Sequence, residues 1–166
     1  MVTYDGAVYS TGSNVGGQLG LGHTDSKSEF NKINGLKNIL NVAAGTQSGA
    51  VDCDGQLYVW GEGVFGTFLS PLKISYRQDV SEFDQISIGK EFGVAKNKKG
   101  KVYAWGMNES GQLGSGDTNE RSFLNAVSAI NYIGVANSIA AGQDFVIALM
   151  DEVEPGQTLE MQQDED

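Results

Sequence analysis

The sequence predicts an all-β protein made of tandem four-stranded antiparallel blades that form part of a β-propeller. Three observations lead to this prediction: a repeat whose copies begin 49 and then 45 residues apart, a period-two apolar pattern inside each copy, and 23 glycines among 166 residues. Glycine is about twice as frequent as in ordinary proteins, which suits many short strands joined by tight turns. Four short strands in a tandem unit of this length are typical of a propeller blade.

The repeat itself is a Gly-x-(Val/Leu)-Tyr-x-x-Gly motif at residues 6–12, 55–61 and 100–106. Between the first and third copies the match continues at a constant offset of 94 residues, through Asn-x-x-Gly-Gln-Leu-Gly segments at 14–20 and 108–114. A second element, of two small or aliphatic residues followed by glycine, occurs at 43–45, 87–89 and 140–142. The residues that define the repeat are Gly6, Tyr9, Gly12, Asn14, Gly17, Gln18, Leu19, Gly20, Gly45, Gly55, Tyr58, Trp60, Gly61, Gly89, Gly100, Tyr103, Trp105, Gly106, Asn108, Gly111, Gln112, Leu113, Gly114 and Gly142.

The strands follow from the alternation and the turn residues. In 57–60 and 102–105 apolar side chains alternate between two faces. Asp-Gly pairs at 5–6 and 54–55 are typical of hairpin turns, and Lys99-Gly100 occupies the same place. We expect the strands of the second unit at 39–44, 49–52, 56–60 and 72–74, and those of the third at 85–88, 94–96, 101–105 and 125–127.

On this plan residues 2–4 and 145–149 are both second strands, so the chain holds about three blades: two whole ones and complementary parts of a third. We do not expect three blades to close a ring. The exposed edges that remain would pair with further blades of a longer protein, with other subunits or with more copies of the chain.

Charge divides the chain into repeats over residues 1–150 and an acidic tail over 151–166. The net charge is −10, and the tail holds seven acidic residues without a lysine or arginine. We expect the tail to be disordered, either as a solvated end or as a docking segment for a basic partner. Direct DNA binding is not expected, because it needs a clustered basic face.

These units resemble the repeats of the regulator of chromosome condensation family, most closely in residues 100–114 and in Ile139-Ala140-Ala141-Gly142. The resemblance covers residues 2–149 and implies a propeller, normally of seven blades, that binds other proteins. It suggests a protein–protein interaction scaffold first. The alternatives are guanine-nucleotide exchange on a small GTPase and association with chromatin or histones. The family's loop asparagine, here Asn108, is expected to hold its turn by hydrogen bonds to nearby backbone.

The second unit departs from the pattern after Gly61. It lacks the Asn-x-x-Gly-Gln-Leu-Gly segment and has Phe65 and Phe68 where that polar loop should be. This stretch is either a repacked turn of a degenerate blade or a loop that presents aromatic side chains to a partner.

No set of residues suggests catalysis, a metal or a cofactor. His23 and Cys53 are the sole histidine and cysteine, which excludes a histidine–cysteine metal cluster and a disulfide within the chain. Residues 61–66 fit G-x-G-x-x-G, but a dinucleotide site needs this motif to open a helix. We therefore expect that the protein is not an enzyme.

The sequence shows no signal peptide and no apolar run long enough for a membrane span. We therefore expect an intracellular protein, either cytoplasmic or nuclear.

Overall fold

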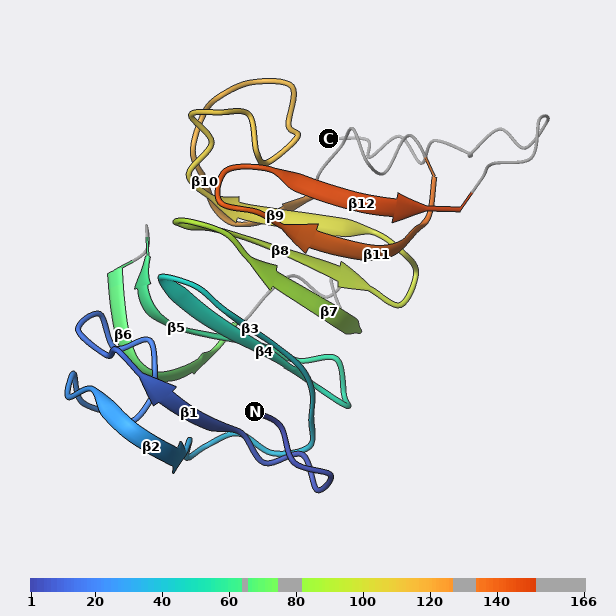
Figure 1. The fold of residues 1–166 in the computed structure, drawn as a ribbon. Helices are drawn as coiled ribbons and strands as arrows, with labels where there is room; N and C mark the ends of the chain where they lie inside the picture. Colours follow the sequence, from blue (N-terminus) through green and yellow to red (C-terminus); the bar gives the residue numbers. More distant parts are fainter. Residues whose placement is uncertain (64–65, 75–81, 127–133, 152–166) are drawn as a thin grey trace.

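The computed structural model describes residues 1–63, 66–74, 82–126 and 134–151, and every regular element in these ranges is a β-strand. Two antiparallel sheets have four strands each, with the strand order following the chain (Figure 1). The first contains β3 (Ile39–Ala44), β4 (Gln47–Asp52), β5 (Leu57–Gly63) and β6 (Gly66–Lys73), and the second contains β7 (Phe83–Ile88), β8 (Phe92–Asn97), β9 (Val102–Gly106) and β10 (Arg121–Ala126). These sheets are the two complete blades that the repeat predicts.

Two smaller sheets flank the complete blades. One pairs β1 (Tyr9–Gly12) with β2 (Lys27–Lys32), and the other pairs β11 (Ala136–Ala141) with β12 (Val146–Met150). The sheets follow one another in an open row that does not close into a ring, which confirms the prediction of a partial propeller (Figure 1). The described ranges contain no helix that is long and apolar enough to cross a membrane.

Some strand limits differ from those expected. The second strand expected at 2–4 forms only an isolated bridge from Val2 to Val8. The outer strands β6 and β10 begin earlier than the expected segments 72–74 and 125–127. In β6 each side chain is exposed or half-buried. An outer strand buries neither face fully, so it lacks the alternation by which the inner strands were predicted. The tail expected from residue 151 lies outside the described residues, apart from Asp151.

A hydrophobic cluster lies in each of the three joints between successive sheets. The first cluster includes Val8, Ile39 and Trp60 and joins β1–β2 to the first complete blade. The second joins the two complete blades. The third joins β8 and β9 to β11 and β12, and includes Phe92 and Ile139. Apolar side chains at these joints are therefore buried between neighbouring sheets.

A polar contact between neighbouring inner strands recurs in two of these joints. Between the two complete blades, the backbone N–H of Ile86 in β7 donates to Oδ1 of Asn41 in β3 over 3.0 Å. Between the second complete blade and β11–β12, the backbone N–H of Ile139 in β11 donates to Oε1 of Gln85 in β7 over 3.0 Å. The side chain that accepts stands at the same repeat position each time, so successive blades are joined by one repeated contact.

Candidate functional site

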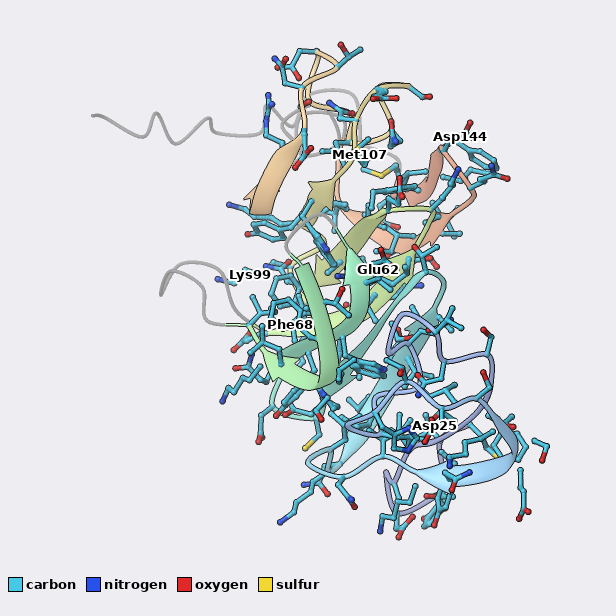
Figure 2. All side chains as sticks on the ribbon, turned by 90° about the vertical axis from the view of Figure 1, so that its left-hand side faces the viewer. Asp25, Glu62, Phe68, Lys99, Met107 and Asp144 are labelled. Carbon is cyan, nitrogen blue, oxygen red and sulfur yellow. The ribbon has the colours of Figure 1, made fainter. Side chains whose placement is uncertain are left out.

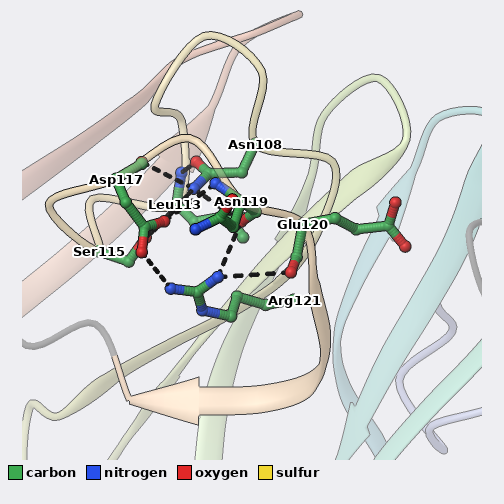
Figure 3. A network of polar contacts seen from close by, with 7 residues as sticks. All are labelled: Asn108, Leu113, Ser115, Asp117, Asn119, Glu120 and Arg121. Carbon is green, nitrogen blue, oxygen red and sulfur yellow. Dashed lines mark hydrogen bonds and ion pairs between the residues drawn. The ribbon is translucent and has the colours of Figure 1, made fainter.

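The loop between β9 and β10 is held by one buried side chain, that of Asn108, which is 1% exposed. Its Nδ2 donates to the carbonyl oxygens of Asp117 and Asn119 over 2.9 and 3.0 Å, and its Oδ1 accepts from the backbone N–H of Leu113 over 2.9 Å (Figure 3). A single amide side chain thus satisfies backbone groups on both sides of the loop.

The loop between β1 and β2 has the same arrangement around Asn14. This side chain is fully buried and donates to the carbonyl oxygens of His23 and Asp25 over 2.7 and 3.1 Å. Its Oδ1 accepts from the backbone N–H of Leu19 over 2.9 Å. The offset of 94 residues in the sequence therefore corresponds to one repeated loop structure.

The glutamines of the two segments act at the tips of these loops. Oε1 of Gln18 accepts from the backbone N–H of Gly16, and Oε1 of Gln112 accepts from that of Ser110, each over 2.9 Å. The carbonyl of Gln18 also accepts from the indole N–H of Trp60 over 2.9 Å, which ties the first loop to the next blade.

Asp117 adds a charged contact at the base of the β9–β10 loop. The backbone N–H of Asn119 and then the Arg121 guanidinium lower the pKa of the Asp117 carboxyl below its ordinary value. The carboxylate is favoured in the folded loop, so this contact is present above the ordinary pKa and is lost as the pH falls through the lowered one.

Replacing Asn108 with alanine is expected to lower the free energy of unfolding by about 1–3 kcal/mol, because the buried N–H of Leu113 loses its acceptor. Urea unfolding monitored by tryptophan fluorescence measures the change. Asn119→Ala is the matched control, since this side chain is exposed in the same loop. Equal effects of the two substitutions would contradict the role given to Asn108.

The second unit has a β-hairpin in place of this loop. Phe68 lies in β6 opposite Gly61 of β5, and its half-buried ring packs against the cluster that contains Trp60. At Phe68 the structure has a strand in place of the turn or exposed loop, and a partner contact by this side chain stays a prediction. Phe65 lies outside the described residues. Gly61 and Gly66 belong to two paired strands, so the G-x-G-x-x-G segment does not open a helix.

The remaining repeat-defining aromatic residues lie in the blades. The hydroxyl of Tyr58 donates to Oδ2 of Asp52 over 3.1 Å. Tyr103 is buried and meets the Phe83 ring edge-on, with 5.5 Å between the ring centroids. Trp105 is 1% exposed in the cluster between the two complete blades.

The repeat-defining glycines lie at turns and strand ends. Gly45, Gly89 and Gly142 follow the inner strands β3, β7 and β11, and Gly12, Gly61 and Gly106 have positive φ near the ends of the third strands. At Gly89 a Cβ atom would lie 2.6 Å from the carbonyl oxygen of Gly142 in the next sheet. The glycines at the inner turns therefore let neighbouring blades approach closely.

The turns after β3, β7 and β11 meet the ends of β5 and β9 on one surface, which we call the loop face. Figure 2 looks onto this face and labels Glu62, Met107 and Asp144 there. Two shallow hollows of about 350 and 180 Å³ lie on it. The residues that line them are Thr46, Glu62, Gly63, Lys90, Glu91, Met107, Glu109, Ser110, Gln112, Gln143 and Asp144.

The loop face is acidic. Glu62, Glu91, Glu109 and Asp144 are exposed around the two hollows, and among the described residues that line them Lys90 is the one basic side chain. Sequence reasoning missed these carboxylates because they lie far apart in the chain and outside the repeat motif. Only Glu91 and Asp144 share a positional signal, since each comes two residues after the glycine that ends an inner-strand element.

The described residues contain no group of three or more histidine, cysteine, aspartate or glutamate side chains placed to hold a metal ion. Nδ1 of His23 accepts from the backbone N–H of Asp25 over 3.1 Å, and Cys53 is exposed as a free thiol. In the described part of the chain these two residues lie in separate loops, so they form no common reactive site.

Comparison with known proteins identifies the repeat. The model described as "Regulator of chromosome condensation (RCC1) repeat" matches residues 5–51 and 99–149, and a second model with this description matches 83–112. The Ultraviolet-B receptor UVR8 of Arabidopsis thaliana is 31% identical over 146 residues, covering 81% of this chain. The human E3 ubiquitin-protein ligase HERC2 is 28% identical over 166 residues, covering 92% of this chain.

A solved structure shows the same fold. Prp20p from Saccharomyces cerevisiae, whose crystal structure was described with its binding properties to Gsp1p and histones, superposes with a TM-score of 0.79 at 20% identity, over 93% of this chain. The chain spans 33% of UVR8, 3% of HERC2 and 42% of the Prp20p chain. The match is therefore to a segment of each of these proteins.

Proposed function

Since the chain belongs to the regulator of chromosome condensation repeat family, we propose that it is a protein-interaction module that binds through its loop face rather than an enzyme. In repeat folds of this kind the blades supply a rigid support and the loops supply the contacts. The specific role that this supports is that of a scaffold or adaptor within a larger assembly.

The observation that carries the proposal is the acidic loop face. Its four carboxylates are exposed: Glu62 lies near the end of β5, and the other three lie on turns and loops that hydrogen bonds hold in place. For example, the backbone N–H of Lys90 donates to the carbonyl of Gln143 over 2.8 Å, which links the turns of two neighbouring sheets. A surface of this charge repels phosphate groups and favours a partner that presents basic side chains.

Charge reversal on the loop face tests the proposal. We expect Glu109→Lys/Asp144→Lys to weaken binding to the partner by about tenfold, because two attractive contacts become repulsive. The control is Glu29→Lys/Asp54→Lys, which changes the net charge equally at exposed positions outside the loop face. Quantitative capture from cell extract with the wild type and both variants finds the partner, and titration of the purified partner then measures its affinity.

A partner that binds the loop-face variant and the control variant equally well would contradict the proposal. Core histones and duplex DNA, each titrated at several salt concentrations, serve as defined probes. Binding to histones that weakens with salt, without DNA binding, would support a chromatin partner.

The second candidate is guanine-nucleotide exchange on a small GTPase. The family resemblance and the binding of Prp20p to Gsp1p favour it. It is tested by following the release of labelled GDP from a panel of small GTPases. Faster release with this chain would favour exchange over a scaffold role, and an unchanged rate across the panel would count against exchange.

A further inference from the structure

An apolar stripe runs along the outer side of β12. It consists of Ile147 and Leu149 in the strand and Phe145 directly before it, and these side chains are 62%, 64% and 53% exposed. The corresponding positions of β8 are buried: Phe92 and Val94 are 2% and 1% exposed. The correspondence follows from the pairing, since Ile147 lies opposite Ala140 of β11 as Val94 lies opposite Ser87 of β7.

The next sheet explains the burial in β8. Phe92 and Val94 lie in one cluster with Ile139 of β11, and Ala141 packs against that cluster. The stripe on β12 therefore corresponds to the surface that β8 contributes to its joint. No sheet among the described residues covers it. Such a stripe is typical of an interaction surface.

The matching half lies at the other end of the row of sheets. A hollow of about 450 Å³ separates β1–β2 from β3, and its lining includes Tyr9, Phe30, Val42, Ala44 and Trp60. Val42, which is 36% exposed, stands where Ile86 and Ile139 stand in β7 and β11, and each of these isoleucines is 4% exposed. The hollow exposes one side of the inner strand β3. In the other two joints the preceding blade covers the corresponding side of the inner strand.

The joint between the complete blades shows how the two halves meet. Gly49 of β4 stands at the position of Ile147, and a Cβ atom there would lie 2.3 Å from Cδ1 of Ile86. Gly49 thus faces Ile86 across the joint. Because Ile147 corresponds to Gly49 and Val42 corresponds to Ile86, Ile147 and Val42 would face each other in an equivalent joint. The described residues of one copy do not form this joint.

We propose that a second copy of the chain supplies the missing half, so that β11–β12 of one copy docks head to tail into the hollow beside β3 of the next. The docked hairpin would supply the two inner strands of a blade whose two outer strands are β1 and β2, in the strand order of the complete blades. Ile147 then packs on Val42, and the stripe fills the hollow.

The polar contact of the inner joints is not repeated at this interface. Ser138 occupies in β11 the position of Asn41 and Gln85, whose side chains accept from an inner-strand N–H of the next blade. Its Oγ accepts from Nε2 of Gln85 in β7, the preceding blade, over 3.2 Å. The joint between copies therefore repeats the apolar contacts of the joints inside the chain.

Part of the hairpin's place is held by the segment Met1–Thr3. The N-terminal amino group of Met1 donates to the carbonyl of Tyr9 over 2.8 Å, and the N–H of Tyr9 donates to the carbonyl of Met1 over 2.9 Å. Docking displaces this segment from the inner edge of β1. The hairpin replaces the same backbone pairing with β1.

Light scattering over a range of concentrations tests the proposal. The wild type is expected to self-associate, and Ile147→Asp to weaken self-association by at least about tenfold, because docking would bury an unpaired carboxylate. Val15→Asp is the control, since Val15 is 79% exposed and lies outside both surfaces. Added salt should strengthen self-association of a chain with net charge −10, whereas it should weaken binding at the loop face.

Crosslinking tests the register in a Cys53→Ser background. Copies with Ile147→Cys mixed with copies with Val42→Cys are expected to form a disulfide-linked dimer, while neither population alone does so. A monomer at all concentrations would overturn the proposal. A dimer of Ile147→Cys copies alone would also overturn it, because that result requires a symmetric interface instead of a head-to-tail one.

Discussion

Replacing Trp105 with alanine is expected to lower the free energy of unfolding by about 3–5 kcal/mol, the range for removing a large aromatic side chain from a core. Trp105 is 1% exposed in the cluster that joins the two complete blades. Its indole N–H also points to Oε1 of Gln47, in the neighbouring blade, at 3.4 Å. The substitution therefore leaves a cavity between the two complete blades.

Urea unfolding followed by circular dichroism measures this effect, and Tyr4→Ala is the matched control because Tyr4 is fully exposed. Loss of the joint should also separate the unfolding of the two blades into distinct transitions. A change below about 1 kcal/mol would contradict the packing described for Trp105.

Replacing Gly55 with alanine is expected to cost about 2–5 kcal/mol, from a positive φ and from a clash with the next blade. Gly55 has a φ of 76°, and a Cβ there would lie 2.4 Å from the Cα of Glu82. The backbone N–H of Phe83 donates to the carbonyl of Gly55 over 3.1 Å, so this turn holds the start of the inner strand β7.

Gly35→Ala separates the two causes. Gly35 has a φ of 86° with no atom within 4 Å of the Cβ position, so it should show only the backbone cost of about 1–2 kcal/mol. Thermal and urea unfolding of both variants give the comparison. Equal losses would mean that the contact between the Gly55 turn and the next blade contributes nothing.

The Gly55 turn also illustrates what the sequence can predict. Asp54-Gly55 identifies a hairpin because few residues adopt positive φ, and Leu57 to Trp60 identify a strand because both faces meet other blades. The outer strand β6 gave a weaker signal, and only 72–74 was expected to be a strand. The side chains of β6 are exposed or half-buried, so their order around Phe68 does not distinguish a strand from a turn or a loop.

The candidate site was less predictable than the fold. The repeat marks Asn14 and Asn108, because the loop needs an amide in the same place twice. Glu62, Glu109 and Asp144 come together only through the stacking of the blades, and their charges are not part of any motif. A surface assembled from several blades has no local pattern in the chain, so it becomes visible only in three dimensions.

The proposed role of the loop face is tested most directly by amide hydrogen exchange of the chain with and without its captured partner. The account predicts slower exchange in the turns at 89–91 and 142–144 and in the loop at 107–112, with no change in the opposite turns at 53–55 and 98–100. Protection confined to the opposite turns, with the loop face unchanged, would contradict it.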